Sequence, residues 1–343
     1  MGATMPDHRP GKLLVTGAPG WLADASLTSL SHNPLPGLRG VRCLVHYATD
    51  MSPLESKQRW GGLDVELVRA DLTEVASLER AVEGIDTVLH AAGIIHVKHI
   101  RDYYAVNTEG ARRLAAAAAR AGAKRFVFIS TNAAGGRSSR RDRPARETDS
   151  DNPLSHYGRS KLLAEKWLFE APDTMQPVVL RPCMFYGPPV PLRHVAIYRR
   201  IIEGRMPLVG GGEYARSLVY IDNLVQCVRL ALTKEAAARQ VYYVADRAPY
   251  TTRRVVEAMA QALGVAPRFL PLPAVAADLA YHADRCLSMM GIYQPTIHLV
   301  GEANWNVGVS IDKARAELGY DPRVEIDEGM RASIDWCREH RLL

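Results

Sequence analysis

The chain has 343 residues, of which 47% are hydrophobic and 23% charged, and its formal net charge is +6. This composition is ordinary for a globular protein and excludes a collagen-like, coiled-coil or largely disordered chain. Because the length exceeds the size at which one core usually keeps growing, we expect a large α/β unit with a smaller companion lobe.

Targeting and cysteine patterns are typical of a protein in the reducing cytoplasm. Residues 1–10 are polar and lack the apolar segment of a signal peptide or anchor. No stretch reaches the roughly 18 uninterrupted apolar residues of a membrane span. The five cysteines lack the CxxC spacing of a metal site, so we predict no bound metal and free, buried thiols at Cys43, Cys183, Cys227, Cys286 and Cys337.

The first 130 residues alternate short apolar strands with helical stretches. The alternation predicts βαβ units, and hence a doubly wound parallel sheet of the Rossmann type with helices on both faces. Strands are expected at 13–16, 41–45, 65–68, 87–91 and 125–129, and helices from Trp21 onward, over 75–82 and over 103–121.

A glycine turn follows the first strand and opens the first helix. This arrangement lets a backbone approach a pyrophosphate. Gly17 supplies the tight turn and Gly20 the close approach, while Ala23 stands where a third glycine would allow tight helix packing. Taken alone, the segment is also compatible with a strand-turn-helix that binds no phosphate.

The end of the second strand bears on the choice of cofactor. An acidic side chain there would bind the ribose 2′-hydroxyl of NAD. The strand instead ends Leu44-Val45-His46-Tyr47, without a carboxylate. Because His46 can accommodate or bind a 2′-phosphate, the sequence favours NADP over NAD, and NAD stays open.

Two later segments carry residues suited to alcohol chemistry. The strand 125–129 is followed by Thr131, at the edge where parallel sheets present ligands. Tyr157 and Lys161 lie one turn apart on a predicted helix, so the ammonium is expected to lower the pKa of the phenol. Tyr157 would then exchange a proton with a secondary alcohol held by Thr131. A surface Tyr-Lys pair is the alternative.

Charge is densest over 137–146, which contains five arginines. Such a cluster could attract nucleic acid or an anionic small molecule. It has no interleaved aromatic residues on which bases could stack, so we predict a mobile, solvated loop and no nucleic-acid partner.

Later strands are expected at 178–180, 218–221 and 241–244, the last two returning to the same sheet. The chain is therefore expected to comprise a flexible tail over 1–11, a dinucleotide-binding domain over 12–183 with 215–248, and a discontinuous substrate lobe over 184–214 with 249–343.

Together these segments resemble the extended short-chain dehydrogenase/reductase family, its NAD(P)-dependent epimerase, dehydratase and reductase group, over nearly the whole chain. The matching motifs are TGAPGWLA from residue 16, ADL from 70, HAAG from 90, VNTEG from 106, ST from 130, YGRSK from 157, RP from 181 and YGP from 186. The resemblance implies a cytoplasmic enzyme with a nicotinamide cofactor and a homodimer that pairs two helices per subunit.

The resemblance also assigns site residues. Thr131, Tyr157 and Lys161 would form the catalytic set, and Asn107 would be either structural or catalytic. The cofactor would contact Gly17, Pro19, Gly20, Trp21, Leu22, His46, Asp71, Leu72, Ala91, Ala92, Gly93, Asn107, Tyr157 and Lys161.

Substrate residues narrow the reaction. Sugar-nucleotide 4,6-dehydratases of the family that this chain resembles carry an Asp-Glu pair where this chain has Asn132-Ala133. The resemblance therefore argues against dehydration and leaves alcohol/ketone interconversion, by net redox or by epimerisation. Arg216 begins a segment that looks like the one with which sugar-nucleotide epimerases and 4-ketoreductases hold the diphosphate. Against this, Met184 stands where many such epimerases carry an asparagine.

Three functions remain open. A nucleotide sugar is the favoured substrate. The apolar stretch 269–291 with 310–320 resembles the 3-beta-hydroxysteroid dehydrogenase-like branch, so a bulky hydrophobic alcohol is the alternative. The third possibility is a non-catalytic dinucleotide-binding sensor.

Overall fold

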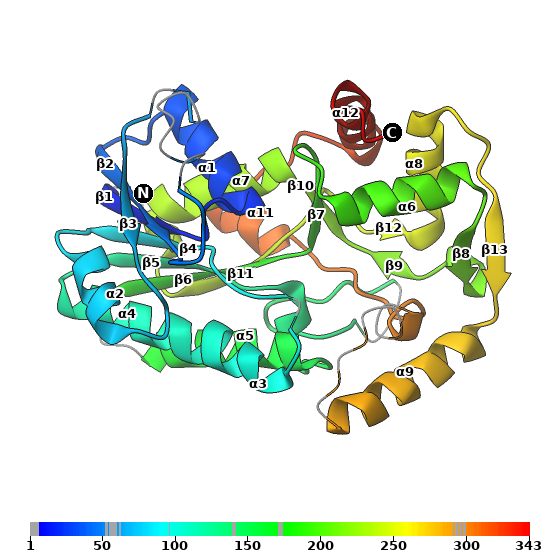
Figure 1. Ribbon diagram of the computed structural model, residues 1–343, viewed down its shortest axis with the longest axis horizontal. Coiled ribbons are helices and arrows are strands. Elements are labelled where there is room, and N and C mark those ends of the chain that lie inside the picture. The colour runs from blue at the N-terminus through cyan, green and yellow to red at the C-terminus, as the bar shows by residue number, and fades with distance from the viewer. Residues whose placement is uncertain are drawn as a thin grey trace.

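A seven-stranded parallel sheet lies in one half of the protein in a computed structural model, at the left of Figure 1. The model describes residues 7–343 except 52, 53, 55–59, 62, 96, 139–141, 171–173, 291, 293, 295, 296, 298 and 299. The strand order is β11-β6-β5-β4-β1-β2-β3. The strands are β1 (Gly11–Thr16), β2 (Leu38–Val45), β3 (Val65–Arg69), β4 (Thr87–His90), β5 (Arg125–Ile129), β6 (Gln176–Pro182) and β11 (Gln240–Val244).

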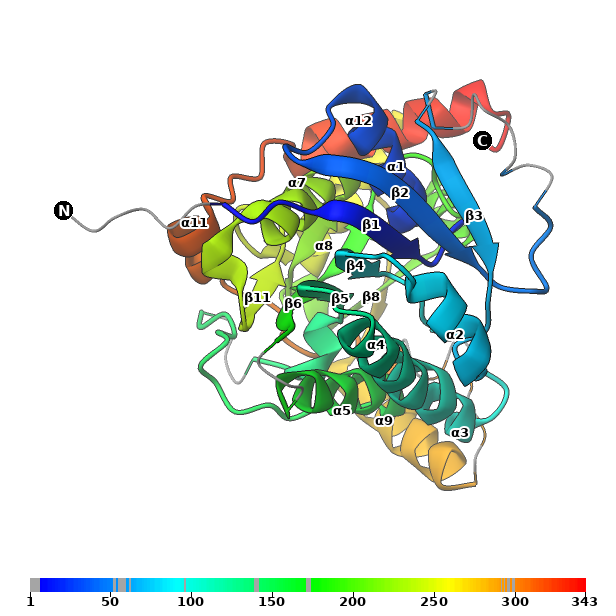
Figure 2. The ribbon, with the colours of Figure 1, turned by 90° about the vertical axis from the view of Figure 1, so that its left-hand side faces the viewer.

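Helices cover both faces of this sheet (Figure 2). One face packs against α1 (Trp21–His32) and α7 (Ile221–Thr233). The other packs against α2 (Val75–Val82), α4 (Ala111–Arg120) and α5 (His156–Glu170). This arrangement confirms the predicted doubly wound fold.

Burial of β1 on both sides explains its continuous apolar sequence. Leu13 and Val15 contribute to the core beneath α1 and α7, whereas Leu14 contributes to the core on the opposite face. Successive side chains of a strand point to opposite faces, so a strand covered on both sides needs apolar residues at every position.

The predicted helix over 103–121 is divided into three parts. It comprises α3 (Ile100–Tyr103), a π-helical segment η1 (Tyr104–Gly110) and α4. The alanines of α4 are buried, which brings this helix close to the sheet.

The other elements in the described part of the chain form three two-stranded sheets with surrounding helices. β7 (Met184–Tyr186) pairs with β10 (Leu218–Tyr220), β8 (Met206–Val209) with β13 (Phe269–Leu272), and β9 (Ala215–Arg216) with β12 (Tyr250–Thr251). The helices are α6 (Leu192–Ile202), α8 (Thr252–Leu263), α9 (Ala274–Met289), α11 (Asp312–Leu318) and α12 (Ile326–Glu339), with short 3₁₀ segments η2 (Asn132–Ala134), η3 (Gly210–Gly212) and η4 (Glu235–Ala237).

The prediction that 218–221 returns to the main sheet is wrong, whereas that for 241–244 is confirmed. β11 occupies the edge beside β6, and β10 pairs with β7 instead. The buried Asp246, just beyond β11, fixes this arrangement. Its carboxylate accepts hydrogen bonds from the Tyr220 amide, at 2.9 Å, and from the Tyr186 hydroxyl, also at 2.9 Å.

The prediction of a mobile, solvated loop over 137–146 is confirmed in part: the described arginines Arg137, Arg143 and Arg146 are exposed, but contacts hold the flanks of the loop. The Ser138 amide donates to the carbonyl of Asn306 at 2.9 Å, and Ala145 forms a β-bridge with Val309. Arg146 pairs with Asp312 at 3.2 Å. These contacts anchor both flanks to the segment 306–312, while 139–141 lie outside the described residues.

The cysteine prediction holds except at one position. The thiols are free, and Cys43, Cys183, Cys227 and Cys337 are buried, but Cys286 on α9 is exposed. Among the helices described, none has the length and apolar character needed to cross a membrane.

Candidate active site

The turn after β1 requires glycine at two positions. Gly17 has φ +94°, and a Cβ there would lie 2.8 Å from the backbone of Ala91 and Ala92. At Gly20 a Cβ would collide with the carbonyl oxygen of Gly17. Gly20 precedes α1 without a side-chain cap, so the first backbone N–H groups of this helix are available to an anion such as a pyrophosphate.

A buried hydrogen-bonded pair joins this turn to the loop after β4. The Thr16 hydroxyl accepts from the Ala92 amide at 3.1 Å and lies 2.7 Å from Nδ1 of His90. Burial, with the nearby charge of Lys161, lowers the pKa of His90 to about 3. His90 is therefore a neutral structural residue that fixes the 91–93 loop.

Thr131, Tyr157 and Lys161 converge at the carboxyl ends of β4 and β5. The Thr131 hydroxyl lies close enough to the Tyr157 phenol to act on its pKa. Lys161 lies one turn further along α5, with its ammonium 4.1 Å from the ring centre of Phe128. A Cβ built on Gly93 would be 3.6 Å from the same nitrogen, so the trio faces the loop that the motifs assign to the cofactor.

Burial dominates the pKa values of Tyr157 and Lys161. It raises the pKa of Tyr157 to about 12, although the Thr131 hydrogen bond acts to lower it. It lowers the pKa of Lys161 to about 7, against the negative charge of Glu165. The expectation that Lys161 lowers the pKa of Tyr157 is therefore wrong for the protein by itself, because desolvation of the phenol outweighs the favourable interactions.

Asn107 stands in the π-helical segment η1 and is buried. Its amide oxygen accepts from the Ile94 amide at 2.9 Å, and its nitrogen donates to the Ile94 carbonyl at 3.0 Å. It also donates to the Ser160 hydroxyl at 3.3 Å. These bonds tie the loop after β4 to α5 and favour the structural role, in a π segment of the kind often found at functional sites.

A buried ionic network that the sequence analysis missed lies behind the trio. The Arg181 Nε donates to both oxygens of Glu165 at 3.1 Å, and its Nη1 donates to Asp151 at 2.7 Å. The Ser130 hydroxyl also bonds to Glu165. Glu165 follows Lys161 by four residues, and this helical spacing is the one sequence signal that could have indicated an acidic residue behind the trio.

Within this network the pKa of Arg181 is raised, so the guanidinium stays protonated. Burial acts to lower the pKa of Arg181, but the bonds and charge of Glu165 outweigh it and raise that pKa. Burial raises the pKa of Glu165, while Arg181 acts to lower it. The charged pair of Arg181 and Glu165, together with Ser130, therefore joins α5 to the ends of β5 and β6.

His46 and Asp71 come together beside the ends of β2 and β3. His46 Nε2 lies 3.3 Å from the Asp71 carboxylate, which also accepts from the Thr73 amide at 2.7 Å. Burial acts to raise the pKa of Asp71, but Thr73 and His46 outweigh it and lower that pKa. Arg69 and Glu74 bond to the neighbouring Tyr47, at its carbonyl and hydroxyl respectively.

The predicted substrate residues come from separate elements. Asn132 begins η2, with its amide oxygen 3.5 Å from the Thr131 hydroxyl. Arg216 lies on β9, where its guanidinium donates to the Glu302 carbonyl at 2.7 Å and burial lowers its pKa. Met184 is 55% exposed. Of these three residues, Asn132 is the one that touches the trio directly.

Trp21 connects the glycine turn to β7, which carries Met184, and to α6. Its ring centre lies 4.8 Å from that of Phe185 on β7 and 5.7 Å from that of His194 on α6. The indole nitrogen donates to the Pro188 carbonyl at 3.4 Å. The start of α1 is thereby packed against β7 and α6.

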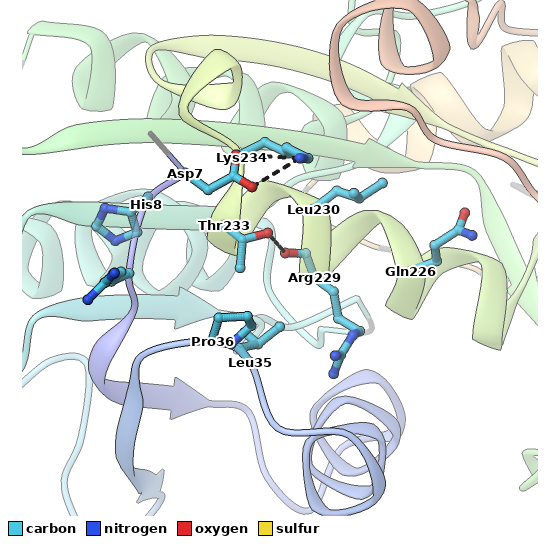
Figure 3. Close-up of a pocket in the computed structure, with 10 residues that line it drawn as sticks. Asp7, His8, Leu35, Pro36, Gln226, Arg229, Leu230, Thr233 and Lys234 are labelled. Carbon is cyan, nitrogen blue, oxygen red and sulfur yellow. Dashed lines mark hydrogen bonds and ion pairs between the residues drawn. The ribbon is translucent and has the colours of Figure 1, made fainter. Parts of the chain in front are cut away.

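A cavity of about 490 Å³ lies away from these residues, beside the amino ends of β1 and β2 (Figure 3). Lys234 turns toward Asp7, 3.1 Å away, whereas Arg229 extends away from this pair. Parallel α/β sheets bind their ligands at the carboxyl ends of the strands. This cavity lies at the opposite ends of the strands, and its Lys234 and Arg229 side chains point in different directions. We therefore assign it no role in the reaction.

Comparison with known proteins is consistent with this geometry. The family model described as "NAD dependent epimerase/dehydratase family" matches residues 13–245. An uncharacterized protein y4nL of Sinorhizobium fredii is 35% identical, with 95% of this chain and 94% of that protein covered. UDP-glucose 4-epimerase of Vibrio cholerae is 28% identical, with 94% of each chain covered.

Two further similarities bear on the reaction. The 2-alkyl-3-oxoalkanoate reductase of Stenotrophomonas maltophilia is 27% identical, with 93% of this chain and 97% of that protein covered. Among solved structures, UDP-glucose 4-epimerase of Thermus thermophilus in complex with NAD is 26% identical, with a TM-score of 0.72 and 95% and 99% coverage.

Proposed function

The chain belongs to the NAD-dependent epimerase/dehydratase family of enzymes, and from this premise we propose that it interconverts a secondary alcohol and a ketone on a nucleotide-activated sugar. The observation that carries the proposal is the approach of the buried Thr131 hydroxyl to the Tyr157 phenol, with Lys161 buried one turn further along α5.

The protein's own groups supply the proton chemistry. Tyr157 holds its proton at neutral pH, because burial raises its pKa to about 12. It is thus ready to donate that proton to a ketone oxygen, which Thr131 orients by a hydrogen bond. In the reverse direction the alcohol proton returns to the phenolate oxygen. The bound nicotinamide would supply or accept the hydride at the substrate carbon.

Binding of the dinucleotide is assigned to the glycine turn and the loop over 91–93. The uncapped start of α1 after Gly20 suits a pyrophosphate. The sequence favours NADP, but we propose NAD, because His46 lies against the Asp71 carboxylate and the neighbouring Tyr47 bonds to Glu74. A 2′-phosphate would meet these negative charges, whereas a ribose hydroxyl can donate to a carboxylate.

Arg216 is the residue proposed for the substrate diphosphate. A guanidinium has five N–H donors, so one that binds the Glu302 carbonyl can also bind diphosphate oxygens. The similarity to UDP-glucose 4-epimerase supports this choice. The proposal keeps residues 12–183 with 215–248 as the dinucleotide-binding part and the other segments beyond residue 183 as the substrate part.

A hydrophobic ketone is the second candidate. The exposed Met184 and the similarity to a 2-alkyl-3-oxoalkanoate reductase favour it. Both candidates use the same trio, so they differ only in what binds beyond Asn132.

The test is a screen of UDP- and GDP-sugars and of hydrophobic ketones with NAD or NADP, following the absorbance of the reduced nicotinamide. A steady change means net redox, and sugar interconversion without such a change means epimerisation. Tyr157→Phe is expected to reduce kcat by about 10²- to 10⁴-fold with little change in cofactor affinity.

Tyr104→Phe is the matched control. Tyr104 bonds to His156 beside the trio, but its phenol lies outside the proton path. It should retain most of the activity. Turnover that persists in Tyr157→Phe would refute the mechanism.

A further inference from the structure

A second arginine, Arg137, contacts the same turn as Arg216. The Arg137 guanidinium stacks over the Trp305 ring, 5.5 Å from the ring centre. The Trp305 amide donates to the Glu302 carbonyl at 3.1 Å, and this carbonyl also accepts from the Arg216 guanidinium at 2.7 Å. Two guanidinium groups from segments far apart in the chain therefore meet at the turn over 302–305.

The fold fixes the backbone on either side of Arg137. Gly136 has φ +93°, and a Cβ there would collide with the carbonyl oxygen of Asn152. The amide and the hydroxyl of Ser138 both donate to the Asn306 carbonyl, each at 2.9 Å. Arg137 is therefore presented from a constrained segment, although its side chain is exposed.

The N–H groups of Arg137 are available to a ligand. Within the basic loop, Arg143 pairs with Asp149 at 3.0 Å, and Arg146 pairs with Asp312 at 3.2 Å. Across the described residues, no hydrogen bond or ion pair uses the Arg137 guanidinium. Stacking on an aromatic ring occupies the face of a guanidinium, so the donors along its edge stay free.

The charge around Arg216 calls for a second cation. Burial lowers the pKa of Arg216, and the negative charge of Glu302 acts to raise it. The Glu302 carboxylate thus already offsets part of the positive charge of this arginine. Each phosphate group of a nucleotide sugar carries a negative charge, and a charge that leaves water without a partner costs free energy. A further arginine at the same turn would complete the balance.

We propose that Arg137 is a second diphosphate-binding residue, which together with Arg216 selects substrates that carry a diphosphate. This assignment rests on the proposed action on a nucleotide sugar. Trp305 is the positioning residue, because its ring holds the Arg137 guanidinium in place before the substrate binds. Trp305 is itself 8% exposed and packs edge-on against Tyr281 at 5.4 Å, so its ring has a fixed orientation.

Titration of the full chain with nucleotides, at a saturating concentration of NAD, tests this assignment. UDP and GDP are the probes for calorimetry, and uridine and guanosine, measured by ligand-observed NMR, report binding without a diphosphate. Arg137→Gln is expected to lower the affinity for UDP or GDP by about tenfold or more, because a charge-assisted contact is lost. The affinity for the corresponding nucleoside should not change.

Arg143→Gln is the matched control, because Arg143 belongs to the same loop, is exposed and pairs with Asp149. It should bind both nucleotides as the wild type does. Equal losses of nucleotide and nucleoside affinity in Arg137→Gln would show that Arg137 only holds the loop, and would overturn the proposal.

Two other outcomes separate this proposal from the proposed function. If Arg216→Gln weakens UDP or GDP binding and Arg137→Gln does not, the role of Arg137 is refuted while the action on a nucleotide sugar stands. A wild type that binds neither nucleotide and turns over a hydrophobic ketone would instead refute the proposed function, and the role of Arg137 with it.

Discussion

The candidate site at the carboxyl-end edge of the sheet and helix α9 contrast in how their side chains are used. At the edge, polar groups are buried and bonded to one another, as in the pair formed by Arg181 and Glu165. On α9 only Ala277 is fully buried, and apolar side chains such as Leu279 face solvent. The polar groups of the edge are thus held by one another, whereas the outer face of α9 is exposed.

This contrast yields a ranking of sensitivity. A change among the buried groups of the edge should alter folding and chemistry together, since each group depends on its neighbours. A change at the substrate residues, which stand on separate elements, should alter binding with little effect on folding. The following predictions test that ranking from the largest effect to the smallest.

Glu165→Gln is expected to cause the largest loss of stability. It removes the more buried of the two carboxylates that compensate Arg181, the other being Asp151, and breaking a buried pair typically costs about 3–5 kcal/mol. Chemical denaturation should show this decrease in the free energy of unfolding. Glu170→Gln, at the exposed end of the same helix, should change it little, and equal effects of the two would contradict the role of the network.

Lys161→Met should be stabilising in a pH-dependent way. The pKa of Lys161 is about 7 in the folded protein, against an ordinary value of 10.5, so between these values the unfolded chain binds more protons. The contribution of this group to stability therefore rises with pH, by up to about 1.4 kcal/mol per unit, and is least favourable below pH 7.

The advantage of Lys161→Met over wild type should accordingly be greatest below pH 7 and shrink up to about pH 10. Denaturation at several pH values without added cofactor measures it. Lys166→Met, on the exposed side of α5, is the control. An advantage that does not vary with pH would show that the ammonium is not desolvated.

Arg216→Ala should raise KM for a nucleotide sugar by about 10- to 100-fold, which corresponds to a lost charge-assisted contact of about 1.4–2.8 kcal/mol. The dissociation constant for the dinucleotide should stay unchanged. Arg200→Ala, on the exposed side of α6, should behave as wild type. An unaffected KM in Arg216→Ala would favour the hydrophobic ketone.

Asp71→Asn should have the smallest effect. Removing one partly exposed carboxylate beside His46 is worth up to about 1 kcal/mol, so the affinity for NADP relative to NAD should rise by up to about fivefold. Calorimetric titration of both dinucleotides measures this ratio independently of turnover. A fall in the ratio would place the 2′-position elsewhere.

Most of the fold could be predicted from the alternation of apolar strands and helices. The positions of β1 to β5 along the chain and the need for glycine at Gly17 follow from short-range patterns. The partner of β10 could not be predicted, because three apolar residues fit either sheet and the choice depends on Asp246, a buried side chain 26 residues beyond Tyr220.

The candidate site was predictable in its residue types but not in its electrostatics. The four-residue spacing of Tyr157 and Lys161 identified the pair, yet not the direction of the Tyr157 pKa shift. That direction depends on burial, which a linear pattern does not contain. Likewise, the spacing of Glu165 from Lys161 fits a helix surface as well as a buried ion pair.

By itself, the sequence determined the doubly wound architecture, the glycine turn and the identity of the catalytic candidates, because periodicity and turn chemistry act over a few neighbouring residues. Tertiary structure alone decided which strands pair beyond β6, which charges are buried together behind Thr131, and which side of α9 faces solvent. These outcomes depend on contacts between residues far apart in the chain, because such contacts decide which groups are buried, and burial sets the free-energy cost of leaving a polar or charged group without a partner.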